Sequence, residues 1–202
     1  MTTFLLIRHA TNDTIGHRIA GRGRGVSLNA EGRAQARALA ERLAGVRLAA
    51  LYASPLERTQ ETAAPIGERL GVPVQSLAEV LEVDYGEWTG LTLDELRASP
   101  GWQAWNGFRS GSRVPAGETL LEVQLRMVGA LERLRCEHAG DRVVGVVSHG
   151  DPIKAAIGYY AGVPIDLLSR LEIAPASVSA LRIESWGAHV VRLNDTGPLV
   201  LP

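Results

Sequence analysis

The chain has few of the residues that mark several classes of protein. Its 202 residues contain one cysteine, Cys136, which excludes an intrachain disulfide and a zinc site built on paired cysteines. Lys154 is the only lysine among 21 basic residues, so cationic contacts fall to arginine. The formal net charge is −1, which leaves no overall positive field for nucleic acid or for an anionic membrane. We therefore expect neither of these as a partner.

Long hydrophobic runs are also missing. The apolar stretch at the N-terminus ends at Arg8, too early for a signal peptide or a transmembrane helix. Hydrophobic residues make up 46% of the chain and charged residues 21%, as in globular proteins, which argues against disorder. The length and cysteine content lead us to expect a cytoplasmic protein with a single domain over residues 1–202.

What the sequence does contain is an alternation of strand and helix patterns. Hydrophobic patterns predict strands at 4–7, 48–53, 72–77, 143–147, 177–183 and 189–193. They predict helices at 30–43, 56–70, 92–98, 101–107 and 119–138, and another after residue 150. Pro65 is expected to kink the second helix or to end it early. Strands separated by helices indicate βαβ units, and therefore an α/β fold around a largely parallel sheet.

Polar side chains of a particular kind follow four of these strands. In chain order they are Arg8 and His9, then Arg58, then Glu82 and Asp84, and finally His149 and Gly150. The carboxyl ends of parallel strands meet at one edge of a sheet, so we expect these side chains to converge there. Taken alone, each has a plainer interpretation as a turn, a solvated helix residue or a surface carboxylate.

Together, these residue types suit phosphoryl transfer. Arginine offers a planar fork of donors that never loses its charge. A neutral imidazole is a good nucleophile for phosphorus, and a second imidazole can stabilise the phosphoryl oxygens. A carboxylic acid can protonate the leaving oxygen and later deprotonate the attacking water. This chemistry requires neither a metal nor another cofactor.

Five motifs carry a resemblance to a known family. They are LIRHA at 6–10, YASPLERTQETA at 52–63, LEVDYGEWTG at 81–90, PAGET at 115–119 and VVSHG at 146–150. Their order and content resemble those of the histidine phosphatase superfamily, also called the phosphoglycerate mutase-like family. The resemblance implies a three-layer α/β/α fold around a mixed, mostly parallel sheet.

The resemblance also implies roles for individual residues. His9 would be the nucleophile that becomes phosphohistidine, and Arg8, Arg58 and His149 would hold the phosphoryl oxygens. Glu82 would be the general acid and base. Asp84 lies two residues further on and would share a face with Glu82 on an extended segment, so position alone does not choose between them.

The sequence departs from the family pattern at two positions. Ala10 stands where the family usually has glycine, and its methyl group is expected to tighten the pocket. Asn12 stands where serine or threonine is usual, and its amide can still donate to a phosphate oxygen. We include Asn12, Arg22 and Gly150 among the predicted substrate-binding residues.

Arg22 belongs to the run GRGRG at 21–25. This run is similar to an RNA-binding arginine-glycine segment, but it is very short and the overall charge is balanced. A mobile loop near the mouth of the site, able to supply a cation to an anionic substrate, is the interpretation we favour.

The leading hypothesis is a metal-independent phosphomonoester hydrolase that acts on a small phosphorylated metabolite. Phosphoglycerate mutase-type transfer needs the same residues, but the longer cofactor-dependent mutases have more chain with which to exclude water. A non-catalytic phosphate-binding protein is a third alternative, against which the joint presence of His9, Glu82 and His149 argues. Sugar phosphates, phosphoglycerate derivatives, cofactor-precursor phosphates and phosphoserine all stay open as substrates, and so does a homodimer.

Overall fold

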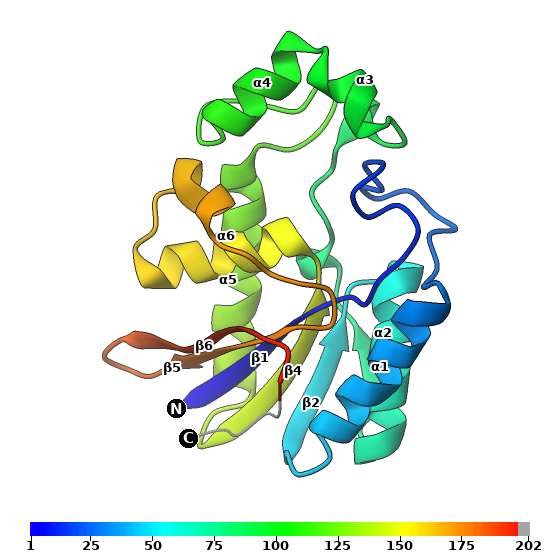
Figure 1. Cartoon of the computed structure of the whole chain (residues 1–202). Helices are drawn as coiled ribbons and strands as arrows, with labels where there is room; N and C mark the ends of the chain where they lie inside the picture. The colour runs from blue at the N-terminus through cyan, green and yellow to red at the C-terminus, as the bar shows by residue number, and fades with distance from the viewer. Residues whose placement is uncertain (198–202) are drawn as a thin grey trace.

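A mixed β-sheet forms the middle layer of the molecule (Figure 1). The computed structural model describes residues 1–197. The strands are β1 (Thr2–Arg8), β2 (Leu48–Ala53), β3 (Val74–Ser76), β4 (Arg142–Ser148), β5 (Val178–Ile183) and β6 (Ala188–Asp195). Within these residues they are ordered β3-β2-β4-β1-β5-β6. The first four strands run parallel, and β5 and β6 add an antiparallel edge. The expectation of a mixed, mostly parallel sheet is confirmed.

Helices cover both faces of this sheet. The elements are α1 (Ala30–Arg42), α2 (Glu57–Leu70), α3 (Leu93–Arg97), α4 (Pro100–Gly107), α5 (Leu120–Glu137) and α6 (Gly150–Ala161), with short 3₁₀ turns at Ala78–Val80, Gly86–Trp88 and Ile165–Arg170. Helices α1 and α2 pack on one face, and α5 and α6 on the other (Figure 1). Helices α3 and α4 lie beyond the carboxyl ends of the strands (Figure 1). The three-layer α/β/α fold is therefore confirmed.

The side chains of strand β1 show why the sheet is covered by helices on both faces. Phe4 and Leu6 join the apolar cluster that contains α5 and α6. Leu5 and Ile7 point the other way, into the cluster that contains α1 and α2. All four side chains are fully buried. The apolar stretch of β1 at residues 4–7 is therefore covered on both faces, which accounts for the uninterrupted hydrophobic run in the sequence.

The helix ends follow the local signals in the sequence. The side chain of Asn29 accepts the Gly32 backbone N–H at 2.8 Å and caps α1. Thr119 and Glu122 form a capping box at the start of α5. Pro65 does not end α2 early, because the helix continues to Leu70.

The packing beyond Pro65 accounts for this continuation. Ile66 is fully buried in the cluster that α2 shares with α1. A Cβ atom on Gly67 would lie 2.7 Å from the Val72 carbonyl oxygen, so the helix packs closely against the chain that leads to β3. Tertiary contacts thus offset the backbone hydrogen bond that proline removes.

None of the helices within residues 1–197 is both long enough and apolar enough to cross a membrane.

Candidate active site

His9 follows the last residue of β1, at the carboxyl edge of the sheet. Its backbone N–H donates to the Ser148 carbonyl at 2.9 Å, which continues the ladder between β1 and β4 by one residue. The ring Nδ1 lies 2.8 Å from the Ala10 carbonyl oxygen. A carbonyl only accepts, so Nδ1 carries the proton and Nε2 presents a lone pair. Burial, followed by the charge of Arg58, lowers the pKa of His9 to about 3, so the imidazole is neutral at physiological pH.

Two arginines flank His9, and each keeps a donor without a partner. Arg8 Nη1 donates to the Ile173 carbonyl at 2.6 Å, while Arg8 Nε is buried and unpartnered. Arg58, from the first turn of α2, donates through Nη2 to the Gly21 carbonyl at 2.8 Å, while its Nη1 is buried and unpartnered. Each guanidinium is thus held by a hydrogen bond from one nitrogen, and a second nitrogen is available to donate to a ligand.

Asn12 presents a donor of the same kind. Its Oδ1 accepts from the Thr14 backbone N–H at 3.0 Å and from the Thr14 hydroxyl at 2.6 Å. These two donors fix the orientation of the amide, so the Nδ2 group points elsewhere. Nδ2 is buried without a partner, and Asn12 lines the same pocket as Arg8, His9 and Arg58.

His149 completes the set from the end of β4. Its ring lies 5.3 Å from the His9 ring, centroid to centroid. His149 Nε2 lies 2.9 Å from the Ser54 hydroxyl, and Nδ1 is buried and unpartnered. If the hydroxyl donates to Nε2, the proton of a neutral ring sits on Nδ1, where it can serve a bound anion. Burial holds the pKa of His149 well below its usual value, in favour of the neutral ring.

Glu82 reaches the pocket from the segment that follows β3. Its side chain is 15% exposed, and Oε2 lies 3.9 Å from His149 Nδ1. Burial, followed by the negative charge of Asp151, raises the pKa of Glu82 to about 7. Near neutral pH the carboxyl can therefore both give up and accept a proton, as an acid–base catalyst must.

Asp84 lies differently, although the sequence alone could not separate it from Glu82. The segment around them is not a regular strand, and Asp84 Oδ1 turns back to accept the Gly86 backbone N–H at 3.0 Å. Asp84 Oδ2 lies 3.5 Å from Arg22 Nη1. Glu82 lines the pocket, and Asp84 is not among its lining residues. The two carboxylates therefore do not share a face.

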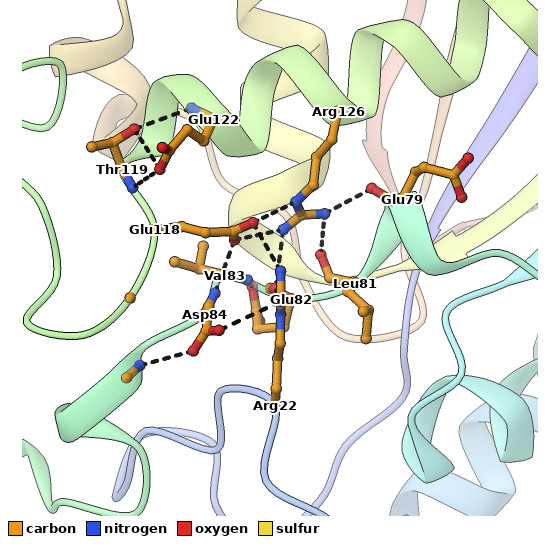
Figure 2. A network of polar contacts seen from close by, with 12 residues as sticks. Arg22, Glu79, Leu81, Glu82, Val83, Asp84, Glu118, Thr119, Glu122 and Arg126 are labelled. Carbon is orange, nitrogen blue, oxygen red and sulfur yellow. Dashed lines mark hydrogen bonds and ion pairs between the residues drawn. The ribbon is translucent and has the colours of Figure 1, made fainter.

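Arg22, Glu118 and Arg126 form a network behind Glu82, which we call the acid clamp (Figure 2). Arg22 Nε and Arg126 Nη2 each donate to the Glu82 carbonyl oxygen at 3.0 Å. The Glu118 carboxylate lies between the two arginines, 2.9 Å from Arg22 Nη2 and 3.1 Å from Arg126 Nε. It also accepts the Asp84 backbone N–H at 3.0 Å. The backbone of the candidate acid is thus fixed from two sides.

The remaining predicted substrate-binding residues occupy distinct places. Arg22 makes the clamp contacts just described and is not among the residues that line the pocket. Its loop lies at the mouth of the site as expected, but it is fastened there by hydrogen bonds rather than standing free. Gly150 begins α6, and a Cβ atom on it would lie 3.6 Å from Arg8 Nε, so it places the helix N-terminus beside that donor.

The expectation for Ala10 is wrong. Its side chain is fully buried in the apolar cluster with α1 and α2, and it does not line the pocket. Its backbone N–H donates to the Thr62 hydroxyl at 3.0 Å. The extra methyl group therefore packs into the core and leaves the space for phosphate unchanged.

One charged group close to the site went unnoticed in the sequence. Asp151, in the first turn of α6, accepts from the Tyr85 hydroxyl at 2.9 Å and from Arg109 Nη1 at 3.1 Å. Tyr85 lines the pocket, and Asp151 contributes to the raised pKa of Glu82. Its position directly after the His149–Gly150 motif was the available signal.

The pocket is small, at about 170 Å³. Loop residues 14–16 and 18–21 form its outer wall together with Leu93. A larger cavity of about 830 Å³ lies at the opposite end of the sheet, lined by Met1 and Arg142 among others, and it contains no histidine. Within residues 1–197 no group of three or more His, Cys, Asp or Glu side chains is arranged to hold a metal ion.

Known proteins are similar to this chain over most of its length. The model of the histidine phosphatase superfamily (branch 1) matches residues 4–196. Phosphoserine phosphatase 1 of Hydrogenobacter thermophilus is 30% identical over 97% of this chain and 93% of its own length. An acid phosphatase of Mycobacterium tuberculosis is 32% identical over 96% of this chain and 92% of its own.

Solved structures extend the similarity to three dimensions. YhfR of Bacillus stearothermophilus is 27% identical, covers 98% of both chains and has a TM-score of 0.91. A mycobacterial glucosyl-3-phosphoglycerate phosphatase, solved as a complex with VO₃, is 28% identical and has a TM-score of 0.87. That similarity covers 96% of this chain and 99% of the other.

Proposed function

The chain belongs to the histidine phosphatase superfamily and is a phosphohydrolase, and on that premise we propose that it hydrolyses small phosphomonoesters through a phosphohistidine on His9. The observation that carries the proposal is a set of four buried donor nitrogens without partners: three belong to residues that line the pocket with His9, and the fourth belongs to His149, whose ring lies 5.3 Å from the His9 ring. They are Arg8 Nε, Asn12 Nδ2, Arg58 Nη1 and His149 Nδ1. A buried donor without a partner is costly, and a phosphoryl group supplies acceptor oxygens to several at once.

In the first step, Nε2 of His9 attacks phosphorus in line with the ester bond. The N–P bond forms, the P–O bond breaks, and the departing oxygen takes the proton of Glu82. Arg8 and Arg58 stabilise the charge on the three equatorial oxygens, as positively charged side chains do in other phosphoryl transfers. The neutral state of His9 favours this step, because a protonated imidazole has no lone pair on Nε2 to offer.

In the second step, water attacks the phosphohistidine. The Glu82 carboxylate takes a proton from the water, the N–P bond breaks, and inorganic phosphate leaves with His9 neutral again. The raised pKa of Glu82 supports both roles, because a group that titrates near 7 exchanges its proton readily at neutral pH. No metal takes part in either step.

The pocket supports a small substrate. Its volume of about 170 Å³ is below the several hundred Å³ typical of ligand sites, so it encloses a phosphoryl group and few further atoms. The rest of the substrate would lie against the loop wall, where Ile15 and Ile19 are apolar and Arg18 is cationic. Phosphoserine and phosphoglycerate derivatives, on which relatives are named to act, are the first compounds to test.

We also propose that the chain works as one domain in the cytoplasm. Its single thiol, Cys136, is free and exposed, which suits a reducing compartment.

The test is a screen of phosphorylated metabolites for release of inorganic phosphate with EDTA present throughout. We expect turnover that EDTA does not affect and that His9→Ala abolishes. Movement of phosphate between substrate positions without release would instead identify a mutase. Tight binding without turnover of any compound would identify a phosphate-binding protein.

A further inference from the structure

Gly21 and Arg22 are neighbours in the chain, yet they contact two different parts of the candidate site. The Gly21 carbonyl accepts from Arg58 Nη2 at 2.8 Å. Arg22 Nε donates to the Glu82 carbonyl at 3.0 Å. A single dipeptide therefore joins a phosphate-binding arginine on α2 to the candidate general acid after β3.

Gly21 fits this place because it has no side chain. Its φ is +49°, and a Cβ atom would lie 2.8 Å from the Thr89 hydroxyl and 3.4 Å from the Tyr85 Cβ. Backbone hydrogen bonds from Ile19 to Leu91 at 2.9 Å and from Gly90 to Ile19 at 2.8 Å seat the loop on the same segment. The loop is thus packed directly against the stretch of chain that follows Glu82.

Arg22 shares its target with Arg126. Both guanidiniums donate to the Glu82 carbonyl, and Glu118 lies between them with distances of 2.9 and 3.1 Å (Figure 2). Arg126 Nη1 also donates to the carbonyls of Glu79 and Leu81, both at 2.7 Å. The Arg126 contacts come from α5, whereas those of Arg22 come from the loop that forms the mouth of the pocket.

We propose that Arg22 is a positioning residue for the general acid: through Gly21 and Arg22, the loop over the pocket fixes where Glu82 stands relative to Arg58. The inference rests on the proposed function, because it assumes that Glu82 protonates the leaving oxygen. The proton must travel from Glu82 to an oxygen bonded to a phosphorus that Arg58 helps to hold. A small change in the spacing of these two groups therefore acts on proton transfer. Arg22 itself does not touch the reacting atoms.

The experiment compares two leaving groups in single-turnover phosphorylation of the full chain. An alkyl phosphate such as phosphoserine needs a proton at the departing oxygen, whereas p-nitrophenyl phosphate needs little help. Arg22→Lys keeps the charge but cannot contact the Glu82 carbonyl, Glu118 and Asp84 at the same time, because an ammonium group lacks the planar fork of guanidinium donors. Arg24→Lys is the matched control, since Arg24 is exposed in the same loop and makes none of the clamp contacts.

For Arg22→Lys we expect the rate on the alkyl phosphate to fall by about ten- to a hundredfold, part of the full contribution of a general acid. The rate on the aryl phosphate should change by less than about threefold, and Arg24→Lys should match the parent on both. Glu118→Gln, which removes the carboxylate between the two arginines, should show the same selective loss to a smaller extent. A general loss of structure would instead lower both rates by the same factor.

Glu82→Gln separates the two proposals. If it loses the alkyl reaction selectively while Arg22→Lys lowers both rates equally or neither, the positioning role of Arg22 is wrong and the acid role of Glu82 stands. If Glu82→Gln itself shows no selectivity between leaving groups, the acid assignment in the proposed function is wrong.

Discussion

Two pairs of arginines lie close together in this protein and differ in how their nitrogens are used. Arg8 and Arg58 in the pocket each have one anchored nitrogen and another that is buried without a partner. Arg22 and Arg126 in the acid clamp bond to carbonyl and carboxylate oxygens, and no buried nitrogen of theirs is left unpartnered in the described part of the chain.

The difference separates binding from positioning. A donor left over after its internal bonds can serve a ligand, whereas a fully bonded arginine holds the chain in place. Cavity size alone would have selected the wrong site. The larger cavity, at the opposite end of the sheet, is lined by neither histidine and not by Glu82. What identifies the site better than volume is that the unpartnered donors of Arg8, Asn12 and Arg58 share one pocket with His9 and Glu82.

After loss of the His9 nucleophile itself, the largest effects should follow changes to the pocket arginines. Arg8→Lys and Arg58→Lys keep the charge but lose the fork, and each should lower kcat/KM by about two to three orders of magnitude. The loss should be similar for alkyl and aryl phosphates, because both share the phosphoryl group. Steady-state kinetics on the folded variants measure this effect. A variant that keeps near-parental kcat/KM would show that its arginine does not bind the phosphoryl group.

The acid should behave differently from the arginines. Glu82→Gln should slow phosphorylation by alkyl phosphates by about a hundredfold or more, the usual contribution of a general acid, and affect aryl phosphates less. Because water activation is lost as well, the phosphoenzyme should also live longer. Asp84→Asn is the matched control two residues away. The assignment is reversed if Asp84→Asn produces this pattern and Glu82→Gln leaves the kinetics intact.

The pH dependence of kcat/KM should show how the charge of Asp151 affects the pKa of Glu82. The pKa of Glu82 is raised to about 7, so kcat/KM on an alkyl phosphate should fall as pH rises through that value and the acid loses its proton. Asp151 contributes to that rise in pKa, so Asp151→Asn should move the descending limb to lower pH. Tyr85→Phe removes the hydrogen bond but keeps the charge, and should leave the limb close to its parental position. If the descending limb of the Asp151→Asn profile stays at its parental pH, Asp151 does not raise the pKa of Glu82.

The smallest effect concerns folding. Glu118→Gln removes charge from the clamp and should lower the free energy of unfolding at pH 7 by about 2 kcal/mol, the scale of hydrogen bonds to charged groups. Burial acts to raise the pKa of Glu118, but hydrogen bonds from Arg126 and the Asp84 N–H, together with the charges of Arg126 and Arg22, lower it in the folded state. Its contribution is therefore full above the unfolded pKa and lost as pH falls through the folded one. The difference between variant and parent in chemical denaturation should shrink below about pH 4, and a pH-independent difference would refute its origin in charge.

Local signals in the sequence were sufficient for the framework. The apolar run of β1, the cap at Asn29 and the capping box at Thr119 act over a few residues, so the sequence alone predicts these elements. His9 and His149 could be predicted together because β1 and β4 are parallel neighbours whose carboxyl ends coincide.

Contacts between distant segments were beyond such reasoning. Arg22 and Glu82 meet across 60 positions, and the sequence offered Arg22 only as a cation near the site. The methyl group of Ala10 packs in the core, and its backbone N–H donates to Thr62, a contact across 52 positions. Glu82 and Asp84 separate because the chain turns at Gly86 instead of continuing as a strand.

The central claim is that phosphate passes through Nε2 of His9. The most direct measurement is acid-labile phosphate on the protein after rapid quenching of turnover with a labelled phosphomonoester, located by peptide mass spectrometry on parent and His9→Ala. We expect label on His9 in the parent, stable in base and lost in acid, and none in His9→Ala. Label on another residue, or undiminished phosphate release by His9→Ala, would contradict it.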